Sequence, residues 1–369
     1  MHNRRWGLDL LRAVAILVVI EQHGRFISEK LGLKLSSLGV TDGVDLFFVL
    51  SGFLIGSILI KDYQEHQTLN VKRFWIRRWL RTLPVYFVAL CVNIIFTVFI
   101  FKDSFSKRDM ALHFAFLQNV IPPYNDFRFF SEAWSLSIEE FFYLSLPLLM
   151  LATTFFLKNK SASKIILYSL LSMVIFSVLM RVILFYKLPA ENYSLNEWNE
   201  RFRVVIPTRL DSLAIGVLAS FIRIRYSSLW NNTQFRWFSF IVGFMLLIIF
   251  DRTQLFTNRV PLGFFSFVLY FLYYSVAVAM TLPFLDSWQP KENIATRFVS
   301  LVSKFSYSMY LFHNSLMAIP LKNYTKTLTN EYAKIGLYAI YWVAVFAVSY
   351  TTYSLIEKPV LAYRDRKFR

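Results

Sequence analysis

Ionisable side chains flank the first apolar segment of the chain, residues 7–27. Asp9 and Arg12 precede its apolar core, and His23 follows it. Eleven positions separate Arg12 from His23. On an α-helix this is about 16 Å of rise, and the two side chains lie on nearly the same face. Ionisable groups at membrane depth are costly and are usually retained for a task. We therefore predict chemistry along this face, between a cation near one membrane surface and a titratable imidazole deeper in.

Two arginines follow the second apolar segment. Arg78 and Arg81 are three residues apart, so on a helix they share a face at the cytoplasmic surface. Each guanidinium can hold two oxygens, and the pair suits a ligand that carries phosphate. A basic cluster that holds lipid headgroups is the alternative, and the residues alone leave both interpretations open.

Adjacent carboxylates, Glu139 and Glu140, stand at the start of the fourth apolar segment. On a helix, Glu139 faces Ser135 and Tyr143, and Glu140 points about 100° away from that face. A carboxylate that enters a membrane needs a partner, and an imidazole from another helix would serve. The alternative is an acidic pair favoured by the positive end of a helix.

Other polar residues in apolar segments have structural interpretations. Arg209 and Asp211 open the sixth segment, and we predict that they form structural ion pairs, with each other or across helices. His313 lies inside the ninth segment and is either a helix contact or a second catalytic group. Small residues in the second segment predict close helix packing: Ser51, Gly52, Gly56 and Ser57.

The composition is that of a membrane protein. The chain has 369 residues, 56% of them apolar, and a mean hydropathy of +0.46, too apolar for a soluble globular domain. We predict an all-α, polytopic protein with one membrane-embedded domain over residues 1–369. Its apolar runs are long enough for about ten transmembrane helices: 7–27, 43–60, 83–101, 138–157, 164–185, 206–222, 237–250, 262–284, 299–320 and 334–356.

The formal net charge of +17 is concentrated in loops on one side of this bundle, chiefly 61–82 and the tail after 357. Because basic loops stay in the cytoplasm, both termini are predicted to lie there, in a multi-pass protein of the cell (inner or plasma) membrane. The charge then reflects orientation, the anionic lipid of the bilayer and an anionic substrate. Nucleic acid is not predicted as a partner.

The sequence lacks the motifs that are typical of several other reaction types. The sequence has no Cys/His metal pattern, no Walker-type glycine loop, no GxGxxG and no G-x-S-x-G. Nucleotide hydrolysis and metal-dependent hydrolysis are therefore disfavoured, and no metal is predicted. The single cysteine, Cys91, excludes an intrachain disulfide.

Together these residues resemble the acyltransferase 3 family of bacterial membrane O-acyltransferases. Four of its motifs occur in order: Arg12-x10-His23, DLFFVLSGFLIG, Arg78-x2-Arg81 followed by Leu83-Pro84, and WSLSIEEFFY. Phe141 stands where the family usually has glutamine. No SGNH-type esterase domain follows the last segment, which favours single-domain members that modify sugars over the two-domain members that acetylate peptidoglycan.

The resemblance implies roles for these residues. The donor is acyl-coenzyme A from the cytoplasm, most often acetyl-CoA, with its phosphates held by Arg78 and Arg81, helped by Arg12. His23 is the general base that takes the proton of the acceptor hydroxyl, or else a covalent acyl carrier. Glu139 orients the imidazole, and Asp45, near the outer end of the second segment, is the second candidate for that role.

The acceptor implied by the resemblance is a carbohydrate or glycolipid at the outer face. Aromatic residues of the outer loops are candidates for stacking on sugar rings: Tyr124, Trp134, Tyr193 and Trp198. Two alternatives remain. One is the other multispan O-acyltransferase superfamily, in which His313 with Asn314 would do the work. The other is a transporter or flippase of a glycan or lipid-linked intermediate, although we find no repeated halves.

Overall fold

The computed structural model describes residues 5–28, 42–66, 68–100, 106–122, 129–157, 160–189, 193–252, 263–325, 328 and 330–368. All regular secondary structure in these ranges is helical. The predicted all-α fold is confirmed.

The longer elements are α-helices, joined or extended by single π-helical or 3-10 turns that are labelled η. In chain order they are α1 (Trp6–Ser28), α2 (Gly43–His66), α3 (Val71–Ile95), η3 (Phe96–Ile100), α4 (Lys107–Phe114), α5 (Ala133–Phe156), α6 (Ala162–Lys187), α7 (Leu195–Trp198), η5 (Asn199–Arg203), η6 (Ile206–Thr208), α8 (Leu210–Arg225), α9 (Ser227–Asn231), α10 (Thr233–Arg252), η7 (Phe265–Leu269), α11 (Tyr270–Ser287), α12 (Ile294–Phe312), η8 (Asn314–Ala318), α13 (Ile319–Thr325), α14 (Glu331–Thr352), η9 (Tyr353–Glu357) and α15 (Lys358–Lys367).

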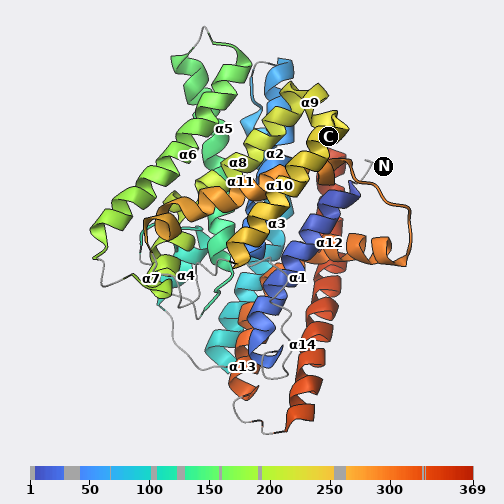
Figure 1. Ribbon diagram of the computed structural model, residues 1–369. Helices are drawn as coiled ribbons and strands as arrows, with labels where there is room; N and C mark the ends of the chain where they lie inside the picture. The colour runs from blue at the N-terminus through green and yellow to red at the C-terminus, as the bar shows by residue number, and fades with distance from the viewer. Residues whose placement is uncertain are drawn as a thin grey trace.

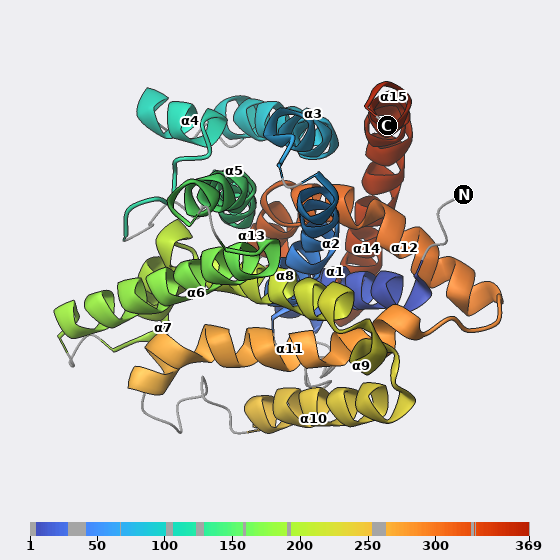
Figure 2. The same cartoon turned by 90° about the horizontal axis from the view of Figure 1, so that it is seen from above.

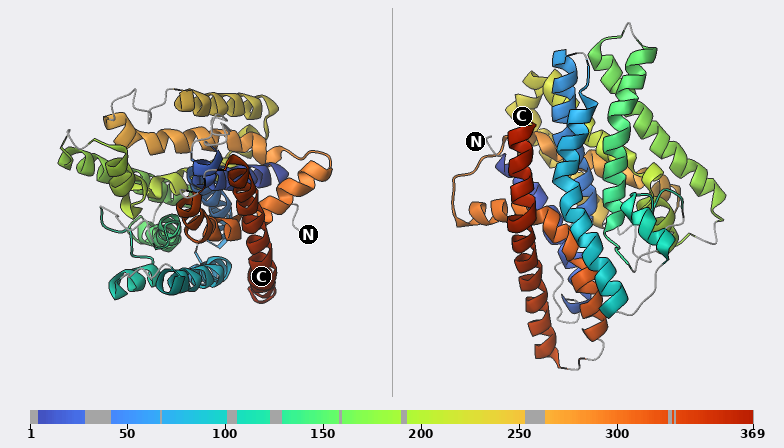
Figure 3. Two further views of the ribbon diagram at one scale, coloured as in Figure 1. Left: turned by 90° about the horizontal axis from the view of Figure 1, so that it is seen from below. Right: turned by 180° about the vertical axis from the view of Figure 1, so that it is seen from behind.

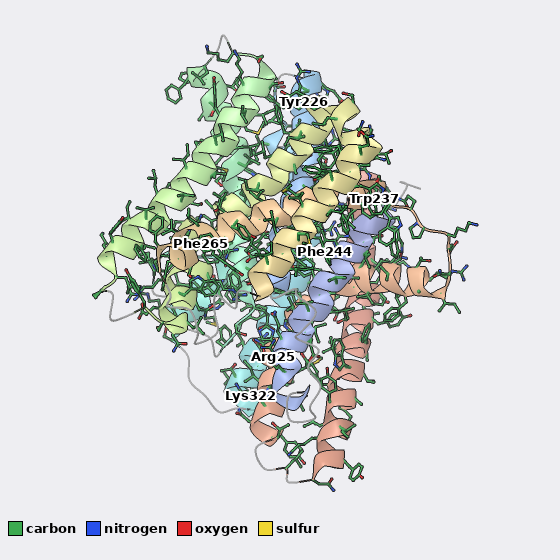
Figure 4. The ribbon with its side chains drawn as sticks, in the orientation of Figure 1. Arg25, Tyr226, Trp237, Phe244, Phe265 and Lys322 are labelled. Carbon is green, nitrogen blue, oxygen red and sulfur yellow. The ribbon has the colours of Figure 1, made fainter. Side chains whose placement is uncertain are left out.

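Each of the ten predicted segments contains a helix. Among the described residues, six helices are long and apolar enough to cross a membrane. The polytopic membrane fold is therefore confirmed, while the full count of ten crossings stays a prediction. The shorter apolar helix α10 also has an apolar outer face. On α10, Trp237 and Phe244 are 52% and 48% exposed (Figure 4). Such exposure suits contact with lipid and would be unusual in water.

The helices α1 and α2 lie in the middle of the bundle (Figure 2), with α3 along one side and α10, packed on α11, along the opposite side. The start of α1 and the end of α15 lie near each other towards the same end (Figure 1), and α13 lies towards the other end. Along one edge, α14, η9 and α15 form a single rod (Figure 3). Residues at the two ends of α1 therefore lie towards opposite ends of the bundle.

The closest helix contact joins α2 to α8, and glycine makes it possible. A Cβ atom on Gly52 would lie 2.0 Å from the carbonyl oxygen of Leu213, and one on Gly216 would lie 2.1 Å from that of Val49. Farther along the same contact, the hydroxyls of Ser57 and Ser220 are 2.8 Å apart. The predicted packing role is confirmed for Gly52, Gly56 and Ser57, because only residues without a bulky side chain let the backbones approach this closely. Ser51 instead lines a cavity, where its hydroxyl lies 2.6 Å from that of Tyr143.

Two buried ion pairs fix α8 against its neighbours. Arg209 pairs with Asp45 of α2. Asp211 pairs with Arg181 of α6, at 2.6 Å. The ring of Phe271 on α11 lies between the two guanidiniums, 3.9 Å from that of Arg209 and 5.4 Å from that of Arg181. The predicted structural pairing is confirmed, and it runs across helices rather than within α8.

The ninth predicted segment is not one regular helix. A capping box of Asn293 and Thr296 starts α12, which ends at Phe312, and the π-helical turn η8 follows before α13. A π-helical turn redirects the side chains around it and is common at functional sites. Here the change of helix type places His313 at the junction.

Candidate active site

The three predicted donor-binding arginines line one cavity of about 300 Å³. Arg12 comes from α1, and Arg78 and Arg81 come from α3. The N-cap Asn70, whose side chain accepts from the backbone N–H of Arg73, starts α3 shortly before this pair. Helices α2, α5 and α12 supply the other walls, which are largely apolar. We call this space the arginine cavity.

The arginine cavity fits a ligand with negative charge. The Nε atom of Arg78 is buried and has no hydrogen-bond partner among the described residues. Arg12 lies 3.4 Å from Asp9 and 3.3 Å from the Ser303 hydroxyl, which itself donates to Asp9 at 2.7 Å. A buried guanidinium with an unused donor is costly unless a ligand satisfies it, and phosphate oxygens match its geometry.

Glu139 also lines the arginine cavity. Its carboxylate accepts from the Tyr143 hydroxyl at 2.7 Å, and that hydroxyl lies 2.6 Å from the Ser51 hydroxyl. The neighbouring Glu140 accepts from Thr82 at 2.8 Å. The structure therefore places the predicted partner of the imidazole with the arginines, away from the residues that contact His23.

A second cavity, of about 210 Å³, contains His23. We call it the histidine cavity. It is bounded by residues from α1, α2, the start of α5, η5, α12 and the start of η8. These are His23, Val44, Ser131, Glu132, Trp134, Asn199, Arg203, Tyr310, His313 and Asn314. Only Val44 and Tyr310 line both this space and the arginine cavity. The two cavities are thus neighbours with a shared wall.

His23 and His313 contact each other across this cavity. The Nδ1 atom of His23 lies 3.1 Å from Nε2 of His313 and 2.9 Å from the carbonyl oxygen of Val19. The Nδ1 atom of His313 lies 2.7 Å from the carbonyl oxygen of Tyr310. The His23 side chain is exposed, whereas His313 is fully buried.

These contacts assign the tautomer of each neutral ring. A nitrogen this close to a carbonyl oxygen has to carry the proton, so Nδ1 is the donor in both rings. The Nε2 atom of His313 is then an acceptor for the Nδ1–H of His23. This leaves Nε2 of His23 unprotonated, without a hydrogen-bond partner among the described residues. That atom is placed to accept a proton.

Glu132 holds the turn after His313, and sequence reasoning missed it. Its carboxylate accepts from the backbone N–H of Ser315 at 3.1 Å and from the hydroxyl of Ser131 at 3.0 Å. The side chain of Asn314 donates to the same Ser131 hydroxyl at 2.6 Å. The available signal was a carboxylate two residues before the WSLSIEEFFY motif, at the N-cap position of α5.

The structure places three of the other predicted site residues in ion-pair or packing contacts, and a fourth, Trp134, in the histidine cavity. Asp45 is held by Arg209. Among the aromatic residues, Trp134 lines the histidine cavity, with the guanidinium of Arg203 4.8 Å from its ring. Trp198 is buried and stacks on Phe271, so its ring is engaged within the protein. Tyr193 packs on Phe185 and Phe267, and Tyr124 lies outside the described residues.

Comparison with known proteins identifies the family of the chain. Residues 5–354 match the family described as an acyltransferase domain. The chain belongs to this acyltransferase family. The resemblance to the acyltransferase 3 family that the sequence predicted is confirmed. Family membership likewise favours an acyltransferase over a transporter.

The similar proteins include named O-acetyltransferases. The peptidoglycan O-acetyltransferase OatA of Listeria monocytogenes is 33% identical over 43% of this chain and 26% of its own length. A putative O-acetyltransferase of Staphylococcus aureus is 31% identical over 58% of this chain and 34% of its own length. The O-acetyltransferase OatA of S. aureus is 27% identical over 98% of this chain. The chain spans at most 58% of the length of these relatives. No solved structure matches it.

Proposed function

We propose that the protein transfers an acyl group, with a preference for acetyl, from acyl-coenzyme A to a hydroxyl of a cell-surface or lipid-linked carbohydrate. One observation carries the proposal. The three arginines suited to a phosphate-bearing donor line one cavity, and a histidine with an available Nε2 lines the cavity that shares its wall. The relatives named as O-acetyltransferases support acetyl as the acyl group.

The donor would be held from the cytoplasmic side. Coenzyme A carries several phosphate charges and a long, thin thioester arm. Arg78 and Arg81 would bind the phosphates, helped by Arg12, and the apolar part of the arginine cavity would take the arm towards His23. Fixed cations in a partly buried site bind phosphate better than solvated ones, because less water competes for them.

The acceptor hydroxyl would be activated by His23. Its Nε2 takes the hydroxyl proton as the oxygen attacks the thioester carbonyl. The new C–O bond forms, the C–S bond breaks, and the proton passes from the imidazolium to the departing thiolate. A general base of this kind contributes about 10²–10⁴-fold. We assign the orienting role to His313, whose Nε2 accepts the Nδ1–H of His23, rather than to Glu139 or Asp45.

The carbohydrate would enter the histidine cavity from the outer face, where Trp134 offers an aromatic edge beside Asn199 and Arg203. In this orientation both termini and the arginine-rich α3 lie towards the cytoplasm, as the distribution of basic residues favours. No metal takes part in the proposed reaction.

The proposal is tested by radiolabelled acetyl transfer from acetyl-CoA into envelope glycan, with membranes that contain the native chain or a variant at equal level. We expect His23→Ala to lower transfer by about 10²–10⁴-fold, since the base is lost. Arg78→Ala and Arg81→Ala are expected to raise the KM for acetyl-CoA. Arg78→Lys and Arg81→Lys, which keep the positive charge, are the matched controls. Full activity of His23→Ala would reject the base assignment, and no transfer by native membranes would reject the proposed function.

A further inference from the structure

Two residues line both cavities, and we call them the wall. Val44 of α2 and Tyr310 of α12 line both the arginine cavity and the histidine cavity. Both are buried, at 6% and 7% exposure. Any group that passes from the arginines to His23 by the direct route has to cross this wall.

Tyr310 is held in place from three directions. Its hydroxyl lies 2.6 Å from the hydroxyl of Ser135 and donates to the carbonyl oxygen of Glu132 at 3.2 Å. Its ring meets that of Phe47 edge to face, with centroids 6.3 Å apart. Its own carbonyl oxygen accepts from His313. The wall is therefore rigid, and the same residue that forms it also fixes the histidine pair.

From this geometry we propose that Tyr310, with Val44, determines which acyl groups are transferred by limiting the length of chain that can reach His23. This rests on the proposed acyl transfer and deepens it. An acetyl group needs only a narrow gap beside the Tyr310 ring. A longer acyl chain has to displace a side chain that is anchored on α5 and packed on α2. A well-packed pocket discriminates one methylene by about 10–200-fold.

The variants test the two wall residues separately from a residue that lines one cavity alone. Tyr310→Ala removes the ring, Tyr310→Phe keeps the ring and removes its hydroxyl anchors, and Val44→Ala thins the wall from another helix. Tyr307→Ala is the matched control. Tyr307 lies one helical turn away on α12 and lines the arginine cavity alone, with its hydroxyl donating to the carbonyl oxygen of Thr82 at 2.7 Å.

The experiment measures incorporation from radiolabelled acetyl-CoA and butyryl-CoA at equal concentration, in membranes that contain the full chain. The readout is the butyryl-to-acetyl ratio, which is independent of the amount of folded protein. We expect Tyr310→Ala to raise the ratio about tenfold or more over native. Val44→Ala and Tyr310→Phe should raise it less, and Tyr307→Ala should leave it unchanged.

Two outcomes overturn the proposal. One is a ratio unchanged in both Tyr310→Ala and Val44→Ala, and the other is an equal rise in Tyr307→Ala, which would assign selectivity to the volume of the arginine cavity. If Tyr310→Ala is not inserted, Tyr310→Leu and Val44→Ala decide the question in the same way. Failure of native membranes to transfer acetyl at all is a separate result, and it rejects the proposed function instead.

Discussion

At the scale of single residues, the histidine pair sets what each ring can do. His313 has both nitrogens engaged, Nδ1 by the carbonyl oxygen of Tyr310 and Nε2 by His23. A buried imidazole with both nitrogens in use is poorly placed to contact substrate. His23 uses only Nδ1 in these contacts. These contacts support the proposed division of roles, in which His23 would react and His313 would position it.

This division predicts different outcomes for two substitutions of His313. His313→Phe removes the acceptor for the Nδ1–H of His23 and should lower kcat about ten- to a hundredfold, because a hydrogen bond to a developing cation is lost. The KM for acetyl-CoA should not change. His313→Gln offers an amide oxygen in place of Nε2 and should restore most of kcat. Steady-state kinetics on inserted protein with matched thermal stability checks this. Equal kcat losses in both variants would indicate that His313 serves packing alone.

Some of this site was predictable and some was not. The spacing of Arg78 and Arg81 and their motif placed them at a donor site with Arg12, and the structure brings all three to one cavity. The contact of His23 with His313 joins residues 290 positions apart. Helical periodicity specifies which residues share a face of one helix, and it carries no information on which helix packs against that face. The same limit explains why Glu132 was missed.

At the scale of elements, the contact of α2 with α8 determines where the wall residue Val44 stands. Gly216 and Gly52 bring the two backbones together, and Arg209 pairs with Asp45, the residue next to Val44. The sequence predicted the packing role of Gly52 correctly, because small residues in an apolar segment have few other uses. It did not identify the partner helix.

A methyl group at this contact should therefore be destabilising. In Gly216→Ala the new Cβ would lie 2.1 Å from the carbonyl oxygen of Val49, so the helices have to separate. Overpacking of this kind costs about 1–3 kcal/mol. Gly336→Ala on α14 is the control, since a Cβ there meets nothing within 4 Å, and alanine is the better helix former by about 1 kcal/mol. Thermal unfolding in detergent should show a lower Tm for Gly216→Ala and an equal or higher Tm for Gly336→Ala. The reverse order would refute the close contact.

At the scale of the whole molecule, the two cavities imply a direction across the membrane. Tyr226 lies towards one end of the bundle, and Arg25, two residues after His23, lies towards the other end with Lys322 (Figure 4). Arg12 and His23 are three helical turns apart on α1. A charged donor too polar to cross the bilayer can then meet an acceptor on the far side, because the protein supplies the path between them.

This direction predicts that the start of α14 faces the outside of the cell and the end of α15 faces the cytoplasm. Tyr332–Lys367 forms one helical span of 36 residues, about 54 Å long, which exceeds a hydrocarbon core of about 30 Å. Both ends therefore reach water. In a Cys91→Ala background, Tyr332→Cys in spheroplasts should react with a membrane-impermeant maleimide, and Arg366→Cys should react only after the membrane is opened. Tyr332 is 85% exposed, so a thiol there is open to the reagent on whichever side of the membrane it lies.

The opposite labelling pattern would put the arginine cavity on the outer side, where coenzyme A is not available, and would remove the physical basis for the proposed donor. Labelling of both thiols in intact spheroplasts would contradict a membrane-crossing α14. The expected pattern would leave one arrangement: arginines within reach of the cytoplasm, His23 within reach of the outer face, and Tyr310 between them. Transfer across the membrane then requires movement of the acyl group alone, over the short distance between two adjoining cavities.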